Sequence, residues 1–188
     1  MQEGFENYMR IAIMGSHSTG KSTLGKKICQ SLGFNFIPDT ASMACKNNFI
    51  INEITPPETQ FWIMSKQLEF ERNIPEPWIE EKSLYDNLIY GRYAKLSKNA
   101  IKVIEDIVER NAKYDLIFYL PIEFAIEDDG VRSMDLNFQK KIDQDLRLYL
   151  KSKNLPFVVL RGSVKERVRN GLKYIKMIEE GCKIINLN

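Results

Sequence analysis

The fold of this chain is decided by the stretch Arg10-Ile-Ala-Ile-Met-Gly-Ser-His-Ser-Thr-Gly-Lys-Ser-Thr-Leu-Gly-Lys-Lys-Ile28. It contains Gly15-x-x-x-x-Gly20-Lys21-Ser22, which is the pattern of a phosphate-binding P-loop. The apolar run before the pattern is typical of a buried parallel strand, and apolar residues at helical spacing follow it. This order of strand, glycine-rich loop and helix lets loop amides and a helix N-terminus enclose an anion. The alternative is a glycine-rich turn that binds no ligand.

The P-loop pattern also predicts what its residues do. Lys21 would bring a positive charge to the β and γ phosphates of a nucleoside triphosphate, and the Ser22 hydroxyl would ligate Mg²⁺. His17, the only histidine, is expected to be a tolerated variable position rather than a catalyst. The predicted nucleotide-binding residues of the loop are Gly15, Ser16, His17, Ser18, Thr19, Gly20, Lys21, Ser22 and Thr23.

Length and composition limit the class of protein. At 188 residues the chain is most simply one domain, residues 1–188, with tails at 1–9 and 179–188. The formal net charge of +2 gives no electrostatic reason to expect nucleic-acid binding. Three scattered cysteines without a C-x-x-C pair predict neither a zinc site nor disulfides. No apolar run approaches the roughly 20 residues of a membrane span. The acidic first residues lack the apolar core of a signal peptide, so we expect a cytoplasmic protein.

The chain alternates strand and helix patterns, which favours a parallel sheet covered by helices. Prolines suit the first turn of the helix after residue 56, and Ser163-Val-Lys-Glu166 forms a capping box. We therefore expect an α/β P-loop NTPase fold with five parallel strands. The expected strands are 10–14, 34–39, 78–82, 115–121 and 156–160; the expected helices are 20–32, 40–48, 56–72, 84–96, 99–111, 136–153 and 163–178.

Acidic residues lie at the ends of two of the predicted strands, at the sheet edge where ligands of open α/β folds bind. Glu81, before Lys82 and Ser83, could hold Mg²⁺ or accept a proton from an attacking hydroxyl, or it could belong to a solvated charge cluster. Strand alternation decides whether Glu80 or Glu81 faces the site. Asp39 suits a general base or a hydroxyl-binding group, and equally an N-cap of the following helix.

Residues of about 122–136 form a polar segment that suits a lid over the nucleotide. Its Asp128-Asp-Gly-Val-Arg132 run carries an arginine whose planar fork could bind the transferring phosphate. The alternative is an ordinary acidic surface loop. Arg167, near the last strand, is placed beside the adenine in this interpretation.

Two helices carry candidate substrate-binding residues. Gln60, with Phe61, Trp62 and Gln67, could read the edge or stack on the face of a base, although apolar helix faces are more often core. Asp86 and Tyr90 share one helix face and could line an acceptor pocket, or simply cap and pack. The candidate substrate-binding residues are Asp39, Gln60, Lys82 and Asp86.

Four motifs in order resemble a family of small P-loop kinases and ATPases that includes the ribosylnicotinamide kinase domain of bacterial NadR. They are the P-loop up to Thr23, Glu81-Lys-Ser-x-x-Asp86-x-x-x-Tyr90, Asp128-Asp-Gly-x-Arg132 and Gly162-x-x-x-Glu166-Arg-Val. The resemblance implies a parallel sheet with a helical lid, ATP with Mg²⁺, and phosphoryl transfer to a small acceptor. The family's Asp-Arg-Ser is replaced here by Glu81-Lys82-Ser83, which is closer to the Glu-Arg-Ser of deoxynucleoside kinases. No arginine follows Asp39 closely, so the resemblance does not transfer the identity of the substrate.

The sequence therefore predicts an ATP-dependent kinase of a nucleoside, a nucleotide or a ribosylnicotinamide-like metabolite. Lys21, Asp39, Glu81 and Arg132 are its candidate catalytic residues, and Ser22 and Glu81 its candidate metal ligands. A regulatory ATPase without an acceptor and a polynucleotide 5′-kinase are the alternatives, although the near-neutral charge argues against the second. The oligomeric state stays open, and a homodimer is compatible with the sequence.

Overall fold

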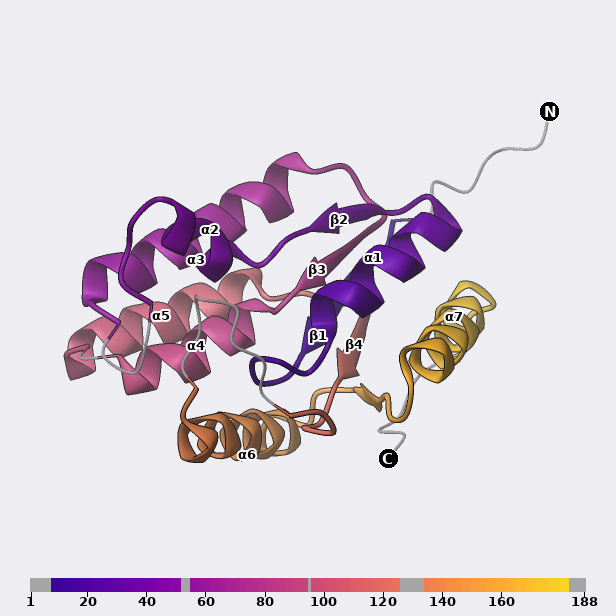
Figure 1. The fold of residues 1–188 in the computed structure, drawn as a ribbon. Coiled ribbons are helices and arrows are strands. Elements are labelled where there is room, and N and C mark those ends of the chain that lie inside the picture. Colours follow the sequence, from indigo (N-terminus) through magenta and orange to yellow (C-terminus); the bar gives the residue numbers. More distant parts are fainter. Residues whose placement is uncertain (1–7, 52–54, 95, 126–133, 183–188) are drawn as a thin grey trace.

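A computed structural model describes residues 8–51, 55–94, 96–125 and 134–182. The described chain folds around one five-stranded sheet with the order β2-β3-β1-β4-β5, and each pair of neighbouring strands is parallel (Figure 1). The predicted α/β fold with five parallel strands is thereby confirmed. The strands are β1 (Arg10–Met14), β2 (Asn35–Ile37), β3 (Trp78–Glu81), β4 (Leu116–Tyr119) and β5 (Val158–Val159).

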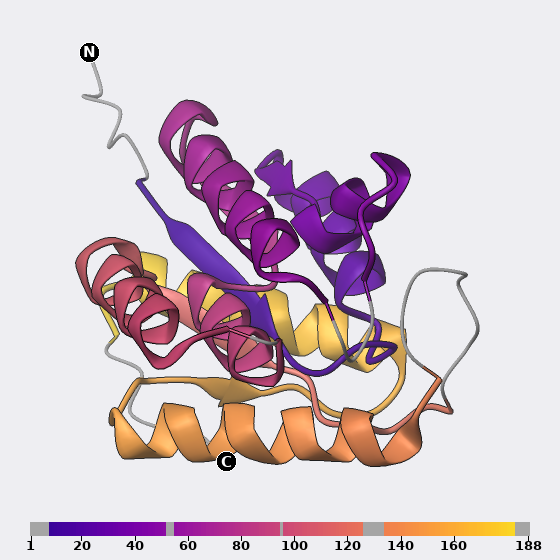
Figure 2. The same cartoon turned by 90° about the vertical axis from the view of Figure 1, so that its left-hand side faces the viewer.

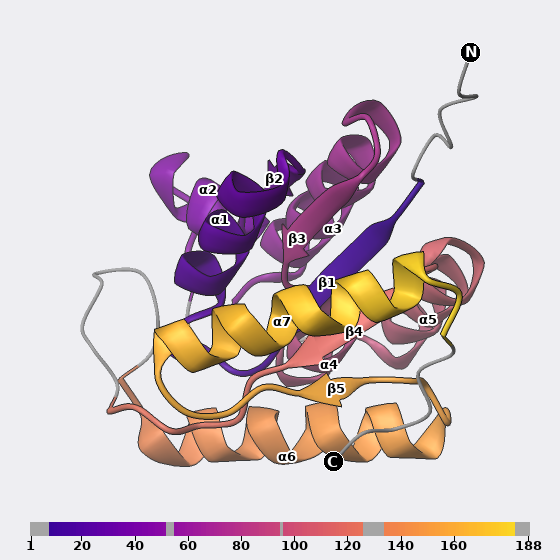
Figure 3. The same ribbon diagram turned by 90° about the vertical axis from the view of Figure 1, so that its right-hand side faces the viewer.

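Helices cover both faces of the sheet. They are α1 (Lys21–Leu32), α2 (Thr40–Lys46), α3 (Pro57–Asn73), α4 (Leu84–Tyr93), α5 (Lys98–Asn111), α6 (Leu136–Ser152) and α7 (Val164–Glu179). Figure 3 shows α7 lying across the sheet on the face that also carries α1. Figure 2 shows α6 running alongside the loop that joins β1 to α1. None of the helices in the described part of the chain is long and apolar enough to cross a membrane.

Two apolar clusters fill the space between the sheet and its helices. The larger lies against α3, α4, α5 and α6 and includes Leu88, Ile104 and Leu146. The second lies against α1 and α7 and includes Leu24, Ile28 and Ile175. Side chains of β1 alternate between them, because successive residues of a strand point to opposite faces. Ala12 and Met14 belong to the first cluster, and Ile11 and Ile13 to the second.

The sheet register brings the carboxyl ends of the central strands together. Ile13 pairs with Glu81, Met14 pairs with Tyr119, and the Lys82 amide donates to the Ile13 carbonyl oxygen at 3.0 Å. The loop after β1 and the residues after β3 therefore share one edge, as expected for the ligand edge of an open α/β sheet.

Several helices and strands are shorter in the structure than the sequence predicts. The second strand ends at Ile37, because Pro38 cannot donate to a ladder and Asp39 already caps α2. The third strand ends at Glu81, and Lys82 turns into the left-handed region with φ of 70°. This strand lies between β1 and β2, so its two glutamates belong to an internal strand, and Glu81 is the last residue of that strand. The helix expected to reach residue 96 ends at Tyr93.

Candidate active site

The loop between β1 and α1 is folded tightly against the end of β4. Gly15 has φ of +146°, and a Cβ built there would lie 2.5 Å from the Leu120 carbonyl oxygen, so this position requires glycine. The Thr19 hydroxyl donates to the Ser16 carbonyl oxygen at 3.0 Å. Lys21 Nζ donates to the same oxygen at 2.5 Å, so the buried ammonium lies inside the curve of the loop.

A pocket with a free volume of about 330 Å³ opens over this loop. Its volume lies in the range of small-molecule sites. We call it the P-loop pocket, and it is lined by Ser18, Thr19, Gly20, Lys21, Ser22, Thr23, Glu81, Phe124, Ala125 and Val164. The structure thus brings Glu81, predicted at the end of β3, into the same pocket as the loop.

Ser22 and Glu81 meet at the floor of the P-loop pocket. The Ser22 hydroxyl donates to Glu81 Oε1 at 2.6 Å. A hydroxyl and a single carboxylate at a phosphate site suit Mg²⁺, which keeps several waters and takes its other ligands from phosphate. No cluster of three or more histidine, cysteine or acidic side chains suited to a metal occurs within the described ranges.

Arg167 is a buried link between the P-loop, the segment before residue 126 and α7. Its side chain is 1% exposed, and it donates to the Thr19 carbonyl oxygen at 2.6 Å and to Glu123 Oε2 at 2.7 Å. Its guanidinium also lies 4.7 Å from the centroid of the Phe124 ring. The described contacts of Arg167 hold the loop backbone in place, and its position beside the adenine stays a prediction.

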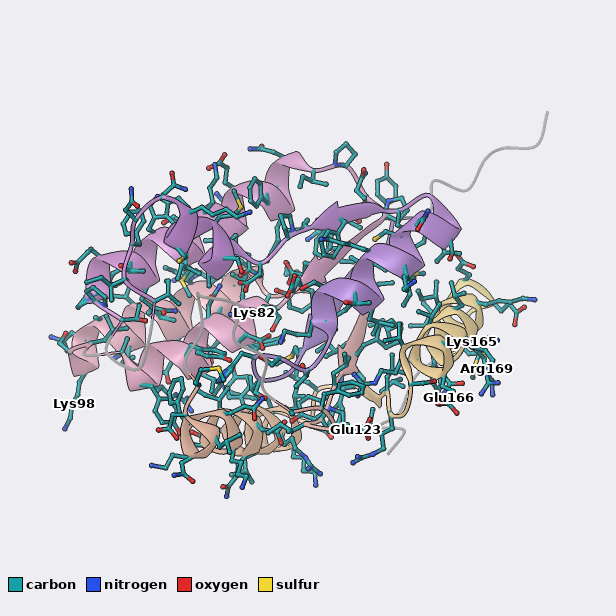
Figure 4. The ribbon with its side chains drawn as sticks, in the orientation of Figure 1. Lys82, Lys98, Glu123, Lys165, Glu166 and Arg169 are labelled. Carbon is teal, nitrogen blue, oxygen red and sulfur yellow. The ribbon has the colours of Figure 1, made fainter. Side chains whose placement is uncertain are left out.

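Glu123 is the acidic partner that this linkage needs. It accepts hydrogen bonds from Arg167, from the Gly162 amide and from Arg161. Burial favours the neutral form, but these three donors outweigh it and lower the pKa of Glu123. Figure 4 shows Glu123 toward α7 and Lys82 toward α4. No sequence motif points to Glu123 and Phe124, because neither residue belongs to one.

A second pocket lies on the other side of the P-loop, against α4 and α6. Its free volume is small, about 50 Å³, which is room for a few water molecules, so a larger ligand must push its walls apart. We call it the aromatic pocket. It is lined by His17, Ala41, Ile51, Thr55, Gln60, Ile63, Lys82, Asn87, Tyr90, Tyr93, Ala94 and Phe138.

Lys82 and Asp39 stand together beside the aromatic pocket. Lys82 Nζ lies 3.4 Å from Asp39 Oδ1 and 4.6 Å from the centroid of the Tyr90 ring. The Asp39 carboxylate also accepts from the Ala41 amide at 3.0 Å and from the Ser42 hydroxyl at 3.2 Å. Asp39 is therefore the N-cap of α2, and it is not among the residues that line either pocket.

The α3 candidates separate in the structure. Gln60 lines the aromatic pocket and donates from Nε2 to the Asn87 carbonyl oxygen at 2.8 Å. Gln67 is buried away from both pockets, where it donates to Glu80 at 3.0 Å and to Glu71 at 3.2 Å. Trp62 packs against Phe49, with ring centroids 5.1 Å apart. Of the group that was expected to read or stack on a base, Gln60 alone reaches a pocket among the described residues.

Asp86 is a buried residue of the first turn of α4, and it forms a capping box with Ser83. Its Oδ2 accepts from the Ser83 amide and from the Ser83 hydroxyl, both at 2.7 Å. Burial raises the pKa of Asp86, and the positive charge of Lys21 and the bonds from Ser83 oppose that rise. Tyr90, one turn along the same helix, lines the aromatic pocket. The capping alternative therefore describes Asp86, and the pocket alternative describes Tyr90.

Most of the predicted lid, including Arg132, consists of residues 126–133, which lie outside the described residues. Its described ends are the Glu123 linkage and Asp135, which caps α6 through its side chain at 2.7 Å from the Asn137 amide.

Solved structures of nucleotide-binding enzymes share this fold. A NadR protein in complex with NR superposes with a TM-score of 0.77 at 20% identity, covering 96% of this chain and 54% of that chain. A deoxyadenosine kinase from M. mycoides gives a TM-score of 0.65 at 16% identity, covering 90% of this chain and 100% of its own. Thymidylate kinase from Candida albicans gives 0.69 at 16% identity, covering 92% of both chains. The chain thus spans about half of the NadR protein, and these likenesses establish the fold.

The sequence itself matches a family of known domains. No curated protein matches the chain. Residues 10–167, however, match a family described as an AAA domain, and they include the P-loop, Glu81 and Arg167. The chain therefore belongs to this AAA-domain family, AAA_28, of P-loop proteins.

Proposed function

We propose that the protein transfers a phosphoryl group from ATP to a hydroxyl of a small acceptor: a nucleoside, a nucleotide or a ribosylnicotinamide-like metabolite. One observation carries the proposal. Two pockets lie beside the P-loop. The P-loop and the end of β3 each contribute residues to both pockets. Lys21 and Glu81 line the P-loop pocket, and His17 and Lys82 line the aromatic pocket. A reaction between two bound substrates needs such adjacent sites, because the acceptor hydroxyl must meet the terminal phosphate.

In this mechanism the protein positions the substrates and stabilises charge. The loop amides and Lys21 hold the β and γ phosphates of ATP, and Arg167 keeps the Thr19 carbonyl oxygen and hence the loop backbone in place. We assign Arg132 to cover the transferring phosphoryl group, because an arginine fork binds phosphate oxygens in pairs. In phosphoryl transfer the protein does little covalent chemistry, so the rate depends on the positioning of the substrates and on the stabilisation of charge.

Ser22 and Glu81 would hold Mg²⁺ with the bound ATP, which supports ATP and Mg²⁺ as the cofactors. When bound, the cation neutralises the negative charge that builds on the phosphates. The acceptor hydroxyl is oriented by Glu81 or by Asp39. Glu81 lies in the P-loop pocket next to Lys82, and Asp39 reaches the aromatic pocket through its ion pair with Lys82.

The structural neighbours support the same class of acceptor. One is a NadR protein with bound NR, and the others are a deoxyadenosine kinase and a thymidylate kinase. Each therefore binds or acts on a nucleoside or nucleotide by its name. Because identities are 16–20%, these neighbours support a kinase of small molecules and leave the acceptor to experiment.

The decisive experiment measures ATP consumption with a panel of nucleosides, mononucleotides, ribosylnicotinamide and a 5′-hydroxyl oligonucleotide. A small acceptor that stimulates ATP turnover and gains phosphate supports the proposal. ATP hydrolysis that no acceptor changes would identify a regulatory ATPase. Phosphorylation of the oligonucleotide, weakened steeply by salt, would identify a polynucleotide 5′-kinase.

A further inference from the structure

His17 stands in the middle of the P-loop sequence, but its side chain lies in the aromatic pocket. The P-loop pocket is lined by the loop from Ser18 to Thr23, without His17. The histidine is 2% exposed, so it is a built part of the interior and not a surface substitution. The ring therefore belongs to the aromatic pocket, and the tolerance of this position to substitution stays a prediction.

Two helices hold the ring and its backbone. Nδ1 lies 3.4 Å from the hydroxyl oxygen of Tyr90 on α4. The ring stacks on Phe138 of α6, with centroids 6.1 Å apart and planes inclined by 29°. The buried Gln139, also on α6, donates to the His17 carbonyl oxygen at 2.8 Å. These contacts direct the imidazole away from the phosphate side of the loop.

Aromatic rings of α4 and α6 gather beside His17. The Tyr90 and Tyr93 rings contact Phe138 edge-on, with centroids 6.3 Å and 5.5 Å away. The face of an aromatic ring packs well against a planar heterocycle. Gln60 and Asn87 line the same pocket, and their amide groups can form hydrogen bonds with the edge of such a ring.

We infer that His17 is a specificity-determining residue for the acceptor, and that with Tyr90 and Phe138 it packs against an uncharged planar ring. The inference rests on the proposed function and narrows it, because it selects neutral nucleoside-like acceptors over a cationic ring such as the pyridinium of ribosylnicotinamide. The contact is made on the acceptor side of the P-loop, so it does not involve the bound ATP.

The charge of the pocket supports an uncharged ring. Aromatic faces attract cations, but the Lys82 ammonium already lies 4.6 Å from the centre of the Tyr90 ring. Asp39, the acid paired with Lys82 at 3.4 Å, is also engaged by the first turn of α2. The pocket-lining residues within the described ranges include no carboxylate. A second cation would therefore find Lys82 already placed at the Tyr90 ring, and no carboxylate among these lining residues.

Direct binding tests the inference. Affinities for a non-hydrolysable ATP analogue, for a panel of neutral nucleosides and for ribosylnicotinamide are measured by calorimetry in the wild type and in His17→Ala. We expect His17→Ala to weaken neutral nucleosides by roughly tenfold or more, the usual effect of losing one stacking partner. Binding of the ATP analogue should change by less than about twofold, because the ring does not line the P-loop pocket.

Two further variants guard against a purely structural effect. His17→Phe keeps a planar ring against Phe138 and should retain nucleoside affinity within about threefold of the wild type. Leu148→Ala removes an exposed side chain of α6 and should leave both affinities unchanged. In addition, Lys82→Met should narrow the preference for neutral nucleosides over ribosylnicotinamide, since it removes the cation that already lies at the Tyr90 ring.

The possible outcomes separate the inference from the proposed function. If His17→Ala weakens the ATP analogue and not the nucleosides, the inference is wrong and the kinase proposal stands. If ribosylnicotinamide binds the wild type more tightly than every neutral nucleoside, the assignment of an uncharged ring is wrong. If the wild type binds no nucleoside and no ribosylnicotinamide, the inference fails together with the proposed function.

Discussion

The two pockets beside the P-loop are built in different ways. Apart from Glu81, Phe124, Ala125 and Val164, the P-loop pocket is lined by the continuous segment 18–23. The aromatic pocket takes its walls from the P-loop, from the α2–α4 region, from the end of β3 and from α6. A continuous segment carries its chemistry in one motif, whereas an assembled wall exists only after folding. The difference indicates that the walls of the aromatic pocket can change from one protein to another while the P-loop and its fold are kept.

The comparison predicts that damage to the P-loop affects every reaction of the protein. Lys21→Ala should lower turnover by about a thousandfold with any acceptor, because a buried charge that faces the phosphates is removed. Steady-state kinetics with each active acceptor measure this loss. Lys26→Ala, on the exposed face of α1, is the matched control and should keep full activity. Wild-type turnover in Lys21→Ala would contradict the placement of the active site.

The neighbouring glutamates of β3 offer a sharper division. Glu81→Gln should slow kcat by roughly a hundredfold and leave the affinity for ATP within about threefold, because it keeps shape and removes the charge next to Ser22. Rapid-mix kinetics and analogue binding separate these two quantities. Glu80→Gln is the control, since Glu80 hydrogen-bonds to Gln67 and lines neither pocket. Equal rates in the two variants would show that Glu81 is a structural charge.

Substitutions in the aromatic pocket should change the KM for the acceptor and leave the KM for ATP nearly unchanged. Phe138→Ala removes the ring that contacts His17, Tyr90 and Tyr93, and we expect it to raise the KM for the acceptor by roughly tenfold. The KM for ATP should stay within about twofold of the wild type. Initial rates with one substrate varied at a time give both values. A rise in the KM for ATP alone would mean that α6 serves the nucleotide side.

These expectations reflect how far sequence reasoning could reach. The P-loop, the sheet and the approach of Glu81 to Ser22 follow from a motif and from strands whose ends share an edge. The position of the His17 ring did not follow, because it depends on contacts with Tyr90 and Phe138, which lie 73 and more than 100 positions away in the sequence. Alternation places Glu80 and Glu81 on opposite faces of β3, but the packing of α3 against the sheet decides which face holds the site.

Of the two adjacent glutamates of β3, Glu80 is the one whose side chain lies in the interior. The smallest effect that we predict concerns the charge of Glu80. Glu80 lies fully buried beside Glu71, Gln67 and Tyr114. Burial raises its pKa well above the ordinary value, and the negative charge of Glu71 raises it further. Burial also raises the pKa of Glu71. The folded protein therefore keeps protons that the unfolded chain releases once the pH exceeds the ordinary glutamate pKa, about 4.3.

Because the folded state binds more protons in that window, the free energy of unfolding should fall as the pH rises from about 4.3 toward the raised pKa of Glu80. Glu80→Gln replaces the acid with a neutral group of the same shape, which can still accept from Gln67. We expect this variant to flatten the fall and to be as stable as the wild type or more stable by about 1 kcal/mol at pH 8. Urea unfolding at several pH values measures it. An unchanged slope would mean that Glu80 is ionised in the folded protein.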